Sequence, residues 1–241
     1  MRYTFLVLFA LILHSCTKEY TAQQIIDNSI KGAKLEGLNE ATLSFNFRNK
    51  AYKAVRNKGV FTFTKEYQKD SLRIKDVLSN NGFERFVNDS LVTLSEKDQG
   101  RFGNSVNSVH YFSILPLGLN DAAVQKKLLE PVTIKGKEYY KVQVTFSQEG
   151  GGDDFDDVFI YWFAKDNFQL DYMAYKYHTN GGGVRFRDVL KEHLVDGIRM
   201  VDYNNYKPKN KDIDFFTIDA LYEAGELQKV SEIVLEDIIV N

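Results

Sequence analysis

The sequence of 241 residues contains one cysteine, three prolines and one tryptophan, and it has no apolar run long enough to cross a membrane as a helix. A single cysteine cannot form a disulfide within the chain, nor can it supply the several thiolates of a cysteine-based zinc site. A transmembrane helix needs about 20 consecutive apolar residues, whereas the apolar run of residues 5–13 is far shorter. The domain therefore depends on its own hydrophobic core, which a chain of this length can form.

An excess of positive charge is also absent. The chain has 31 Lys and Arg residues against 33 Asp and Glu residues, and its formal net charge is −2. General nucleic-acid binding needs a basic surface that displaces counterions from the phosphates. We therefore expect no nucleic-acid partner.

Motifs of the common catalytic and cofactor sites are missing as well. There is no GxSxG nucleophile elbow, no P-loop and no HExxH zinc motif. We expect no cofactor, and the sequence favours a non-enzymatic protein over an enzyme. A hydrolase is the alternative, with His110 acting as an acid–base group together with Glu149 and the region from Tyr161 to Asp171.

The first residues have the pattern of an export signal. Arg2 precedes the apolar run of residues 5–13, and the segment from Leu13 to Cys16 resembles a lipobox. A basic start, an apolar segment and a small-residue cleavage site are typical of a secretory signal. We therefore predict that residues 1–15 are removed as a signal peptide and that Cys16 carries a lipid. His14 departs from the small residue usual in a lipobox, so a plain signal peptide with an incidental cysteine is the alternative.

What the chain has in abundance is aromatic residues and alternating polarity, which favour a sheet. The segment 20–30 predicts a leading helix, with Thr21 and Gln24 placed as a capping box. Strands are predicted at residues 43–48, 52–56, 60–65, 71–77, 132–134, 139–146, 158–163, 170–177, 184–190, 198–206, 214–218 and 229–235, with a hairpin at 84–94 that turns at Asn88-Asp89.

The middle of the chain predicts two helices, at 104–115 and 121–129, broken near Pro116 because the residue before proline disfavours helical backbone. Short turns rather than helical crossovers join most strands, which favours antiparallel pairing. We therefore predict one lipid-anchored β-rich domain over residues 16–241. Its expected class is α+β, mainly β, with a large curved antiparallel sheet (a half-barrel), a leading helix and a central helical plug on one face.

Several segments resemble an uncharacterised family of bacterial exported lipoproteins, domain-of-unknown-function family 6503. They are NSVHYF (107–112), LP (115–116), YYKV (139–142), YWF (161–163), LDY (170–172), GGGVRFR (181–187) and DYNNY (202–206). The resemblance covers roughly residues 20–210 and implies no activity. The order of elements is also similar to that of the lipoprotein-carrier half-barrels, which implies a sheet able to hold an acyl chain or another apolar ligand.

Two arginines are the best candidates for a polar ligand contact. Arg185 and Arg187 are two apart in a predicted strand, so both side chains project from one face. If this face is the concave one, they can fix an anionic headgroup together with Tyr161, Tyr203 and Tyr206. The alternative, which is slightly favoured, is that they pair with Asp171 or Asp202 within the sheet. His110 is a further candidate ligand contact, and a structural histidine is the favoured alternative there.

An acidic cluster is the main candidate for a metal site in the sequence, since a site formed by His110, His178 and His193 would need the fold to bring them together. Its carboxylates belong to Asp153, Asp154, Asp156 and Asp157, and oxygen ligands of this kind bind calcium. The spacing is not that of an EF-hand, so a solvated loop is favoured and no metal is expected.

These patterns together predict an exported, lipid-anchored protein of the bacterial cell envelope, on the outer membrane and facing the periplasm. The leading hypothesis is a protein that binds an apolar or amphipathic ligand, such as a lipid or acyl chain, in a cavity of the curved sheet. Its partners would be the membrane, through the anchor, and that ligand. The alternatives are the hydrolase based on His110 and a scaffold protein without a ligand.

Overall fold

A computed structural model describes residues 19–149, 155–178, 181–210 and 212–241. The predicted signal segment, Cys16, Asp153 and Asp154 lie outside the described residues. No helix in the described ranges is both long and apolar enough to span a bilayer.

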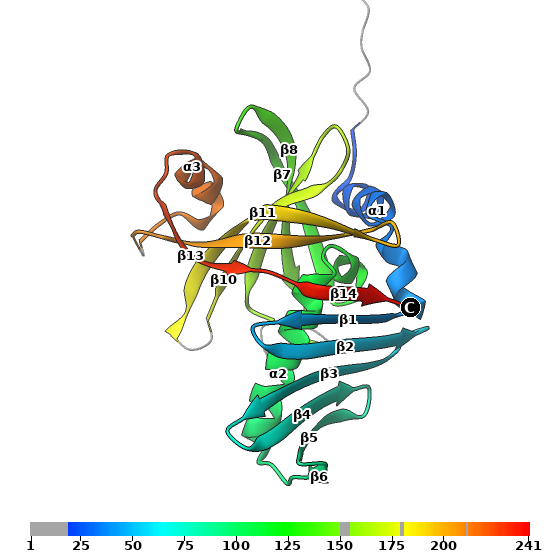
Figure 1. Cartoon of the computed structure of the whole chain (residues 1–241). Helices are drawn as coiled ribbons and strands as arrows, with labels where there is room; N and C mark the ends of the chain where they lie inside the picture. The colour runs from blue at the N-terminus through cyan, green and yellow to red at the C-terminus, as the bar shows by residue number, and fades with distance from the viewer. Residues whose placement is uncertain (1–18, 150–154, 179–180, 211) are drawn as a thin grey trace, which may run out of the picture.

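The strands form two seven-stranded antiparallel sheets, which we call sheet A and sheet B (Figure 1). Sheet A has the order β14-β1-β2-β3-β4-β5-β6, and sheet B has the order β13-β12-β11-β10-β9-β8-β7. Sheet A consists of β1 (Thr42–Phe47), β2 (Lys50–Asn57), β3 (Val60–Lys69), β4 (Leu72–Ser79), β5 (Gly82–Val87), β6 (Ser90–Leu91) and β14 (Glu236–Val240). Sheet B consists of β7 (Val124–Ile134), β8 (Lys137–Phe146), β9 (Val158–Ala164), β10 (Leu170–Tyr177), β11 (Gly183–Val195), β12 (Ile198–Pro208) and β13 (Leu227–Ile233).

The C-terminal segment links the two sheets (Figure 1). Strand β13 pairs with β12 in sheet B, and two residues later β14 pairs with β1 in sheet A. The backbone N–H of Leu235 within this link donates to Asp202 Oδ1 at 2.9 Å. The other oxygen of Asp202 lies 2.8 Å from His193 Nε2. The buried carboxylate therefore holds the link where the chain passes from one sheet to the other.

Helix α1 (Ala22–Gly32) has the predicted capping box, in which Thr21 and Gln24 bond each other's backbone N–H groups. Its predicted apolar face is buried, with Ile25 and Ile26 fully enclosed. The helix packs against β7 and against the 3₁₀ helices η1 (Leu35–Glu40) and η2 (Leu117–Asn120).

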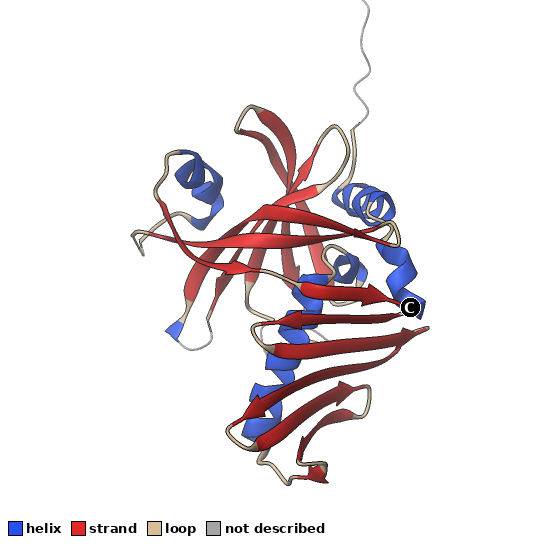
Figure 2. Ribbon diagram, in the orientation of Figure 1, coloured by secondary structure: helices blue, strands red, loops and turns tan. Residues whose placement is uncertain are grey.

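Helix α2 (Glu96–Ser113) is the predicted central plug, and it starts eight residues earlier than predicted, with Ser95 as its N-cap. It lies against β3, β4 and β5 of sheet A (Figure 2). A buried ion cluster fastens it there. Asp76 lies 3.0 Å from Lys65 Nζ and accepts two hydrogen bonds from Arg85, at 2.6 and 2.9 Å.

Both cations of this cluster also contact α2. Lys65 Nζ lies 3.2 Å from Ser105 Oγ, and the guanidinium of Arg85 lies 3.4 Å from the ring centre of Phe102. The lysine, aspartate and arginine are cross-strand neighbours on β3, β4 and β5, so the register of three strands brings them together.

A second, smaller core lies on the outer face of sheet B, under α3 (Ile218–Glu223). Lys141 Nζ lies 2.9 Å from Asp219 Oδ2, and the indole N–H of Trp162 donates to the same oxygen at 3.3 Å. These buried polar contacts join α3 to β8 and β9.

The predicted class is confirmed: the fold is mainly β, with a leading helix and a helical plug, and its strands are divided between two sheets. The predicted turn at Asn88-Asp89 is confirmed, since both residues are left-handed between β5 and β6. The predicted helix at 121–129 is wrong, because this segment pairs with β8 as strand β7. The predicted strand at 214–218 is also wrong. Asp214 caps the 3₁₀ helix η4 (Phe215–Thr217), and α3 follows directly.

Candidate functional site: a cavity beside the plug helix

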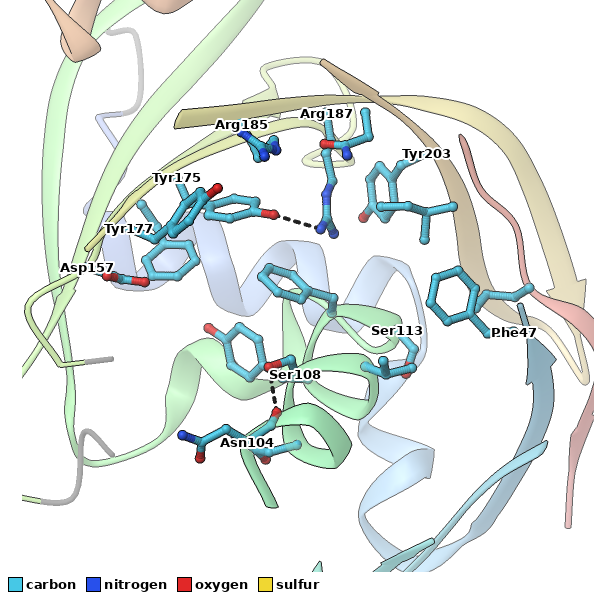
Figure 3. A pocket seen from close by; sticks show the side chains of 18 of the residues that line it. Phe47, Asn104, Ser108, Ser113, Asp157, Tyr175, Tyr177, Arg185, Arg187 and Tyr203 are labelled. Carbon is cyan, nitrogen blue, oxygen red and sulfur yellow. Dashed lines mark hydrogen bonds between the residues drawn. The ribbon is translucent and has the colours of Figure 1, made fainter. Parts of the chain in front are cut away.

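A cavity of about 520 Å³ lies between α2 and the inner face of sheet B (Figure 3). This volume falls within the range of small-molecule sites. The cavity is lined by Phe47, Arg48, Asn104, Asn107, Ser108, Val109, Tyr111, Phe112, Ser113, Phe146, Asp157, Phe159, Tyr175, Tyr177, Arg185, Arg187, Val201, Tyr203, Asn205, Ile233 and Leu235.

Aromatic rings form much of its apolar wall. Phe112 of α2 faces Tyr175 of β10, with ring centres 5.5 Å apart, and Tyr175 stacks on Phe159 of β9 at 5.6 Å. Phe146 of β8 meets Phe159 edge to face at 5.6 Å. Three of these rings come from strands of sheet B, and α2 adds the fourth from the opposite side of the cavity.

The predicted arginine pair lies in this cavity. Arg185 and Arg187 project from β11 on the same side, as their spacing requires (Figure 3). Arg187 is only 7% exposed, donates from Nη2 to the Tyr175 hydroxyl at 3.0 Å and lies 4.4 Å from the ring centre of Phe112. Arg185 lies over the ring of Tyr177 at 5.4 Å and donates to the carbonyl of Val184.

The alternative that these arginines pair with Asp171 or Asp202 is not what the structure has. Asp171 contacts Lys137, Tyr139 and Arg199. Asp202 is bonded to His193 and to the link between the sheets. Among the described residues, no carboxylate oxygen lies within 4.0 Å of the guanidinium of Arg187 or Arg185. Both arginines are therefore available to a ligand.

The three predicted tyrosines occupy different positions. Tyr203 lines the cavity beside Arg187, and burial raises its pKa to about 12, so its phenol is a neutral hydrogen-bonding group. Tyr161 is fully buried in the core behind the wall, where burial raises its pKa. Tyr206 is on the outer face, packed on Phe186, with its hydroxyl 3.3 Å from Asp188. Tyr203 and Tyr206 are three residues apart, an odd spacing that puts them on opposite faces.

His110 faces sheet A and does not line the cavity. Its Nε2 donates to the carbonyl of Thr64 at 3.2 Å, and the ring stacks on Phe63 at 4.7 Å. The ring edges meet Phe45 and Tyr52. Burial lowers the pKa of His110 to about 4, so the imidazole is neutral near pH 7. This environment matches the alternative of a structural histidine, and it does not bring the ring to Asp171.

Part of the predicted acidic cluster meets a histidine. The ligand atoms of Asp156, Asp157 and His178 lie within 4.8 Å of one another, and the histidine Nδ1 is 3.6 Å from each carboxylate. Calcium takes six to eight oxygen ligands, and these three side chains supply fewer. The carboxylate of Asp157 also accepts a hydrogen bond from the backbone N–H of His178 at 3.2 Å.

Sequence reasoning missed the contribution of α2 to the site. Ser108 and Phe112 are four residues apart and face the cavity, whereas Val106 and His110 have the same spacing and are buried. Helical periodicity predicts two faces of this kind, but the sequence does not say which face meets which sheet.

Comparisons with solved structures show the fold. A LolA superfamily protein from Nitrosomonas europaea is 12% identical, with 92% of this chain and 94% of that chain covered and a TM-score of 0.52. A putative outer membrane lipoprotein-sorting protein domain from Vibrio parahaemolyticus is 8% identical, with 82% and 98% covered and a TM-score of 0.40. The lipoprotein LppX of Mycobacterium tuberculosis is 12% identical, with 66% and 87% covered and a TM-score of 0.28.

The first of these matches establishes a LolA-like fold for this chain. No curated protein matches this chain. The model of one sequence family, described as a family of unknown function, matches residues 2–236, which is nearly the whole chain. The chain therefore belongs to the DUF6503 family.

Proposed function

We propose that this protein is a lipid-anchored protein of the bacterial cell envelope that binds an amphipathic ligand with an acyl chain in the cavity beside α2. The cavity of about 520 Å³, with its wall of Phe112, Phe146, Phe159 and Tyr175, is the observation that carries this proposal. Rings of this kind remove an acyl chain from water, and each buried methylene contributes about 0.8 kcal/mol.

The similarity to a LolA superfamily structure supports the proposal at the level of the fold alone. The predicted lipidation of Cys16 would hold the domain close to lipid, where an amphipathic ligand is available. Binding rather than chemistry is favoured because His110, the best catalytic candidate of the sequence, lies outside the cavity.

A blocked cavity should lose the ligand. Residues 17–241 contain every described element, and they are exported to the periplasm behind a cleavable signal and purified without detergent, which would compete for the cavity. Ser113→Trp places an indole among the lining residues near Phe47 and Tyr203 (Figure 3). Native mass spectrometry should find co-purified lipid on the unsubstituted chain and roughly tenfold less on this variant, an effect of about 1.4 kcal/mol.

Ser90→Trp on the exposed strand β6 is the matched control, and it should retain the lipid. Equal lipid occupancy of both variants would contradict the location of the site. Absence of lipid from the unsubstituted chain in repeated preparations from a bacterial envelope would contradict the proposed function.

The proposed anchor is tested separately. Cells given labelled palmitate should incorporate the label into the wild-type chain and not into Cys16→Ser, because no other thiol is present. The wild-type protein should also fractionate with membranes. A wild-type chain that takes up no palmitate would exclude the lipoprotein assignment and leave the cavity proposal to be judged by the mass spectra.

A further inference from the structure

Within the described residues, three arginines of the cavity lining lack a carboxylate partner, as Arg56 outside the cavity also does. Arg73, Arg85, Arg101 and Arg199 each lie within 4.0 Å of a carboxylate. In the described part of the chain, no such pair is formed by the three arginines that line the cavity, Arg48, Arg185 and Arg187. Asp157 is the one carboxylate among the described lining residues, so the wall carries an excess of positive charge.

Of the three, Arg187 is the strongest candidate for binding an anion because its side chain is buried. It is 7% exposed, and its Nε has no hydrogen-bond partner among the described residues. Its Nη2 donates to the hydroxyl of Tyr175, and the ring of Phe112 lies under the guanidinium. A buried charge without a counter-ion is costly, and aromatic faces offset only part of this cost.

The surroundings of Arg187 fit an anion. Tyr203 and Asn205 lie on β12, the strand next to Arg187, and both line the cavity. A guanidinium donates two parallel hydrogen bonds to a carboxylate or phosphate, and such charge-assisted pairs are stronger than neutral ones. The phenol of Tyr203 adds a neutral group that can donate to the same anion.

We infer that the cavity selects amphiphiles that carry a negatively charged carboxylate or phosphate group. This group pairs with Arg187, and the acyl chain lies along the ring of Phe112 and the rings of β8 to β10. This inference rests on the proposed function, and it adds the charge of the ligand and the residue that binds the charged group. Arg185 on β11 and Arg48 in the turn after β1 also line the cavity and are more exposed than Arg187, so their charges attract the anion to the cavity.

The test compares three probes with the same chain length on detergent-free residues 17–241. Palmitate carries a carboxylate, 1-palmitoyl-lysophosphatidylglycerol carries a phosphate diester and hexadecanol is neutral. Each probe is supplied in vesicles of neutral phosphatidylcholine, and the amount bound to the protein after the vesicles are removed is measured by native mass spectrometry. The unsubstituted chain should bind at least one anionic probe more tightly than hexadecanol. The preferred anionic probe identifies the source as a free fatty acid or a phospholipid.

Arg187→Met keeps most of the apolar volume and removes the charge. It should weaken binding of the preferred anionic probe roughly 10- to 100-fold and leave hexadecanol within about threefold. Arg187→Lys, which keeps the charge and loses the two-pronged donor, should fall between these limits. Arg101→Met, which removes an exposed arginine outside the cavity, should change nothing.

The two proposals fail in different ways. If none of the three probes binds the unsubstituted chain, the proposed function is wrong. The further inference is wrong if hexadecanol binds as tightly as both anionic probes. It is also wrong if Arg187→Met binds the anionic probes as tightly as the Arg101→Met control does, because the cavity then binds acyl chains regardless of their charge. Retained hexadecanol binding shows that the Arg187 variants are folded.

Discussion

Replacement of Asp76 by alanine is expected to lower the free energy of unfolding by about 3–5 kcal/mol, which is the range for breaking a buried ion pair from one side. The Asp76 side chain is fully buried, and it neutralises two cations at once, Lys65 and Arg85. Without it, both cations stay in a site that is nearly closed to water. Burial already lowers the pKa of Lys65, which shows the direction of the desolvation cost.

The loss should extend to α2. Lys65 and Arg85 reach Ser105 and Phe102 of this helix, so the ion cluster is part of its seat on sheet A. Hydrogen exchange in α2 should therefore accelerate in the variant more than exchange in sheet B, because local stability follows local contacts.

Glu66→Ala is the matched control. Glu66 of β3 also pairs with a cation on the neighbouring strand, Lys75 of β4, but both side chains are exposed. Exposed pairs contribute at most about 1 kcal/mol. Urea denaturation of the two variants should therefore differ severalfold in the loss of stability. Equal losses would mean that Asp76 is not a buried counter-ion in solution.

A fall in stability between pH 7 and pH 4 is the second large effect that we expect, and His110 is its source. The unfolded chain protonates this histidine near its ordinary pKa of 6.5, whereas burial in the folded protein lowers the pKa to about 4. Between these values the unfolded state binds more protons, so stability falls as the pH falls. A difference of this size corresponds to about 3 kcal/mol, complete near pH 4.

His110→Phe isolates this contribution. Phenylalanine has no titratable group, and the site is already lined by the rings of Phe45, Tyr52 and Phe63. The variant loses the hydrogen bond to Thr64, which is independent of pH in this range. Unfolding of both proteins is measured in urea from pH 7.5 to pH 4.5, and the wild type should lose stability relative to the variant. A constant difference across this range would show that the histidine is not buried and neutral.

The strands of the half-barrel were predictable wherever one face is buried and the other is polar. In β11 the alternation places Arg185 and Arg187 on one side and buries Phe186 on the other, because successive side chains of a strand point to opposite faces. The capping box at Thr21 was equally local, and it appears as predicted.

The errors occurred where short apolar runs fit two kinds of element. Val124, Leu128 and Leu129 have helical spacing, but the segment pairs with β8 over most of its length, with a bulge between Leu129 and Val132. That pairing is a long-range choice that no local pattern specifies. The run at 214–218 was too short to distinguish a strand from a helix, and the capping role of Asp214 was the overlooked signal.

For the same reason, one wall of the cavity could be predicted from the sequence and the other could not. Its sheet wall follows from alternation, which also explains why Tyr206 does not belong to it. Its helix wall depends on which face of α2 packs on sheet A. The ion cluster around Asp76 and the packing of His110 hold that face, which leaves Phe112 facing Arg187. Neither contact can be inferred from spacing along the chain.

The two walls of the cavity belong to different sheets, and this has a consequence for ligand size. Helix α2 is bound to sheet A, whereas Arg187 and its neighbours belong to sheet B, and Val234 and Leu235 join β13 to β14 across the boundary. This link is one of several contacts between the sheets, because β11 also contacts β14 and one hydrophobic core includes residues of both sheets. A ligand of the proposed kind must therefore fit a cavity whose width is set by packing between the two sheets, and a thicker ligand would have to displace residues of that shared core.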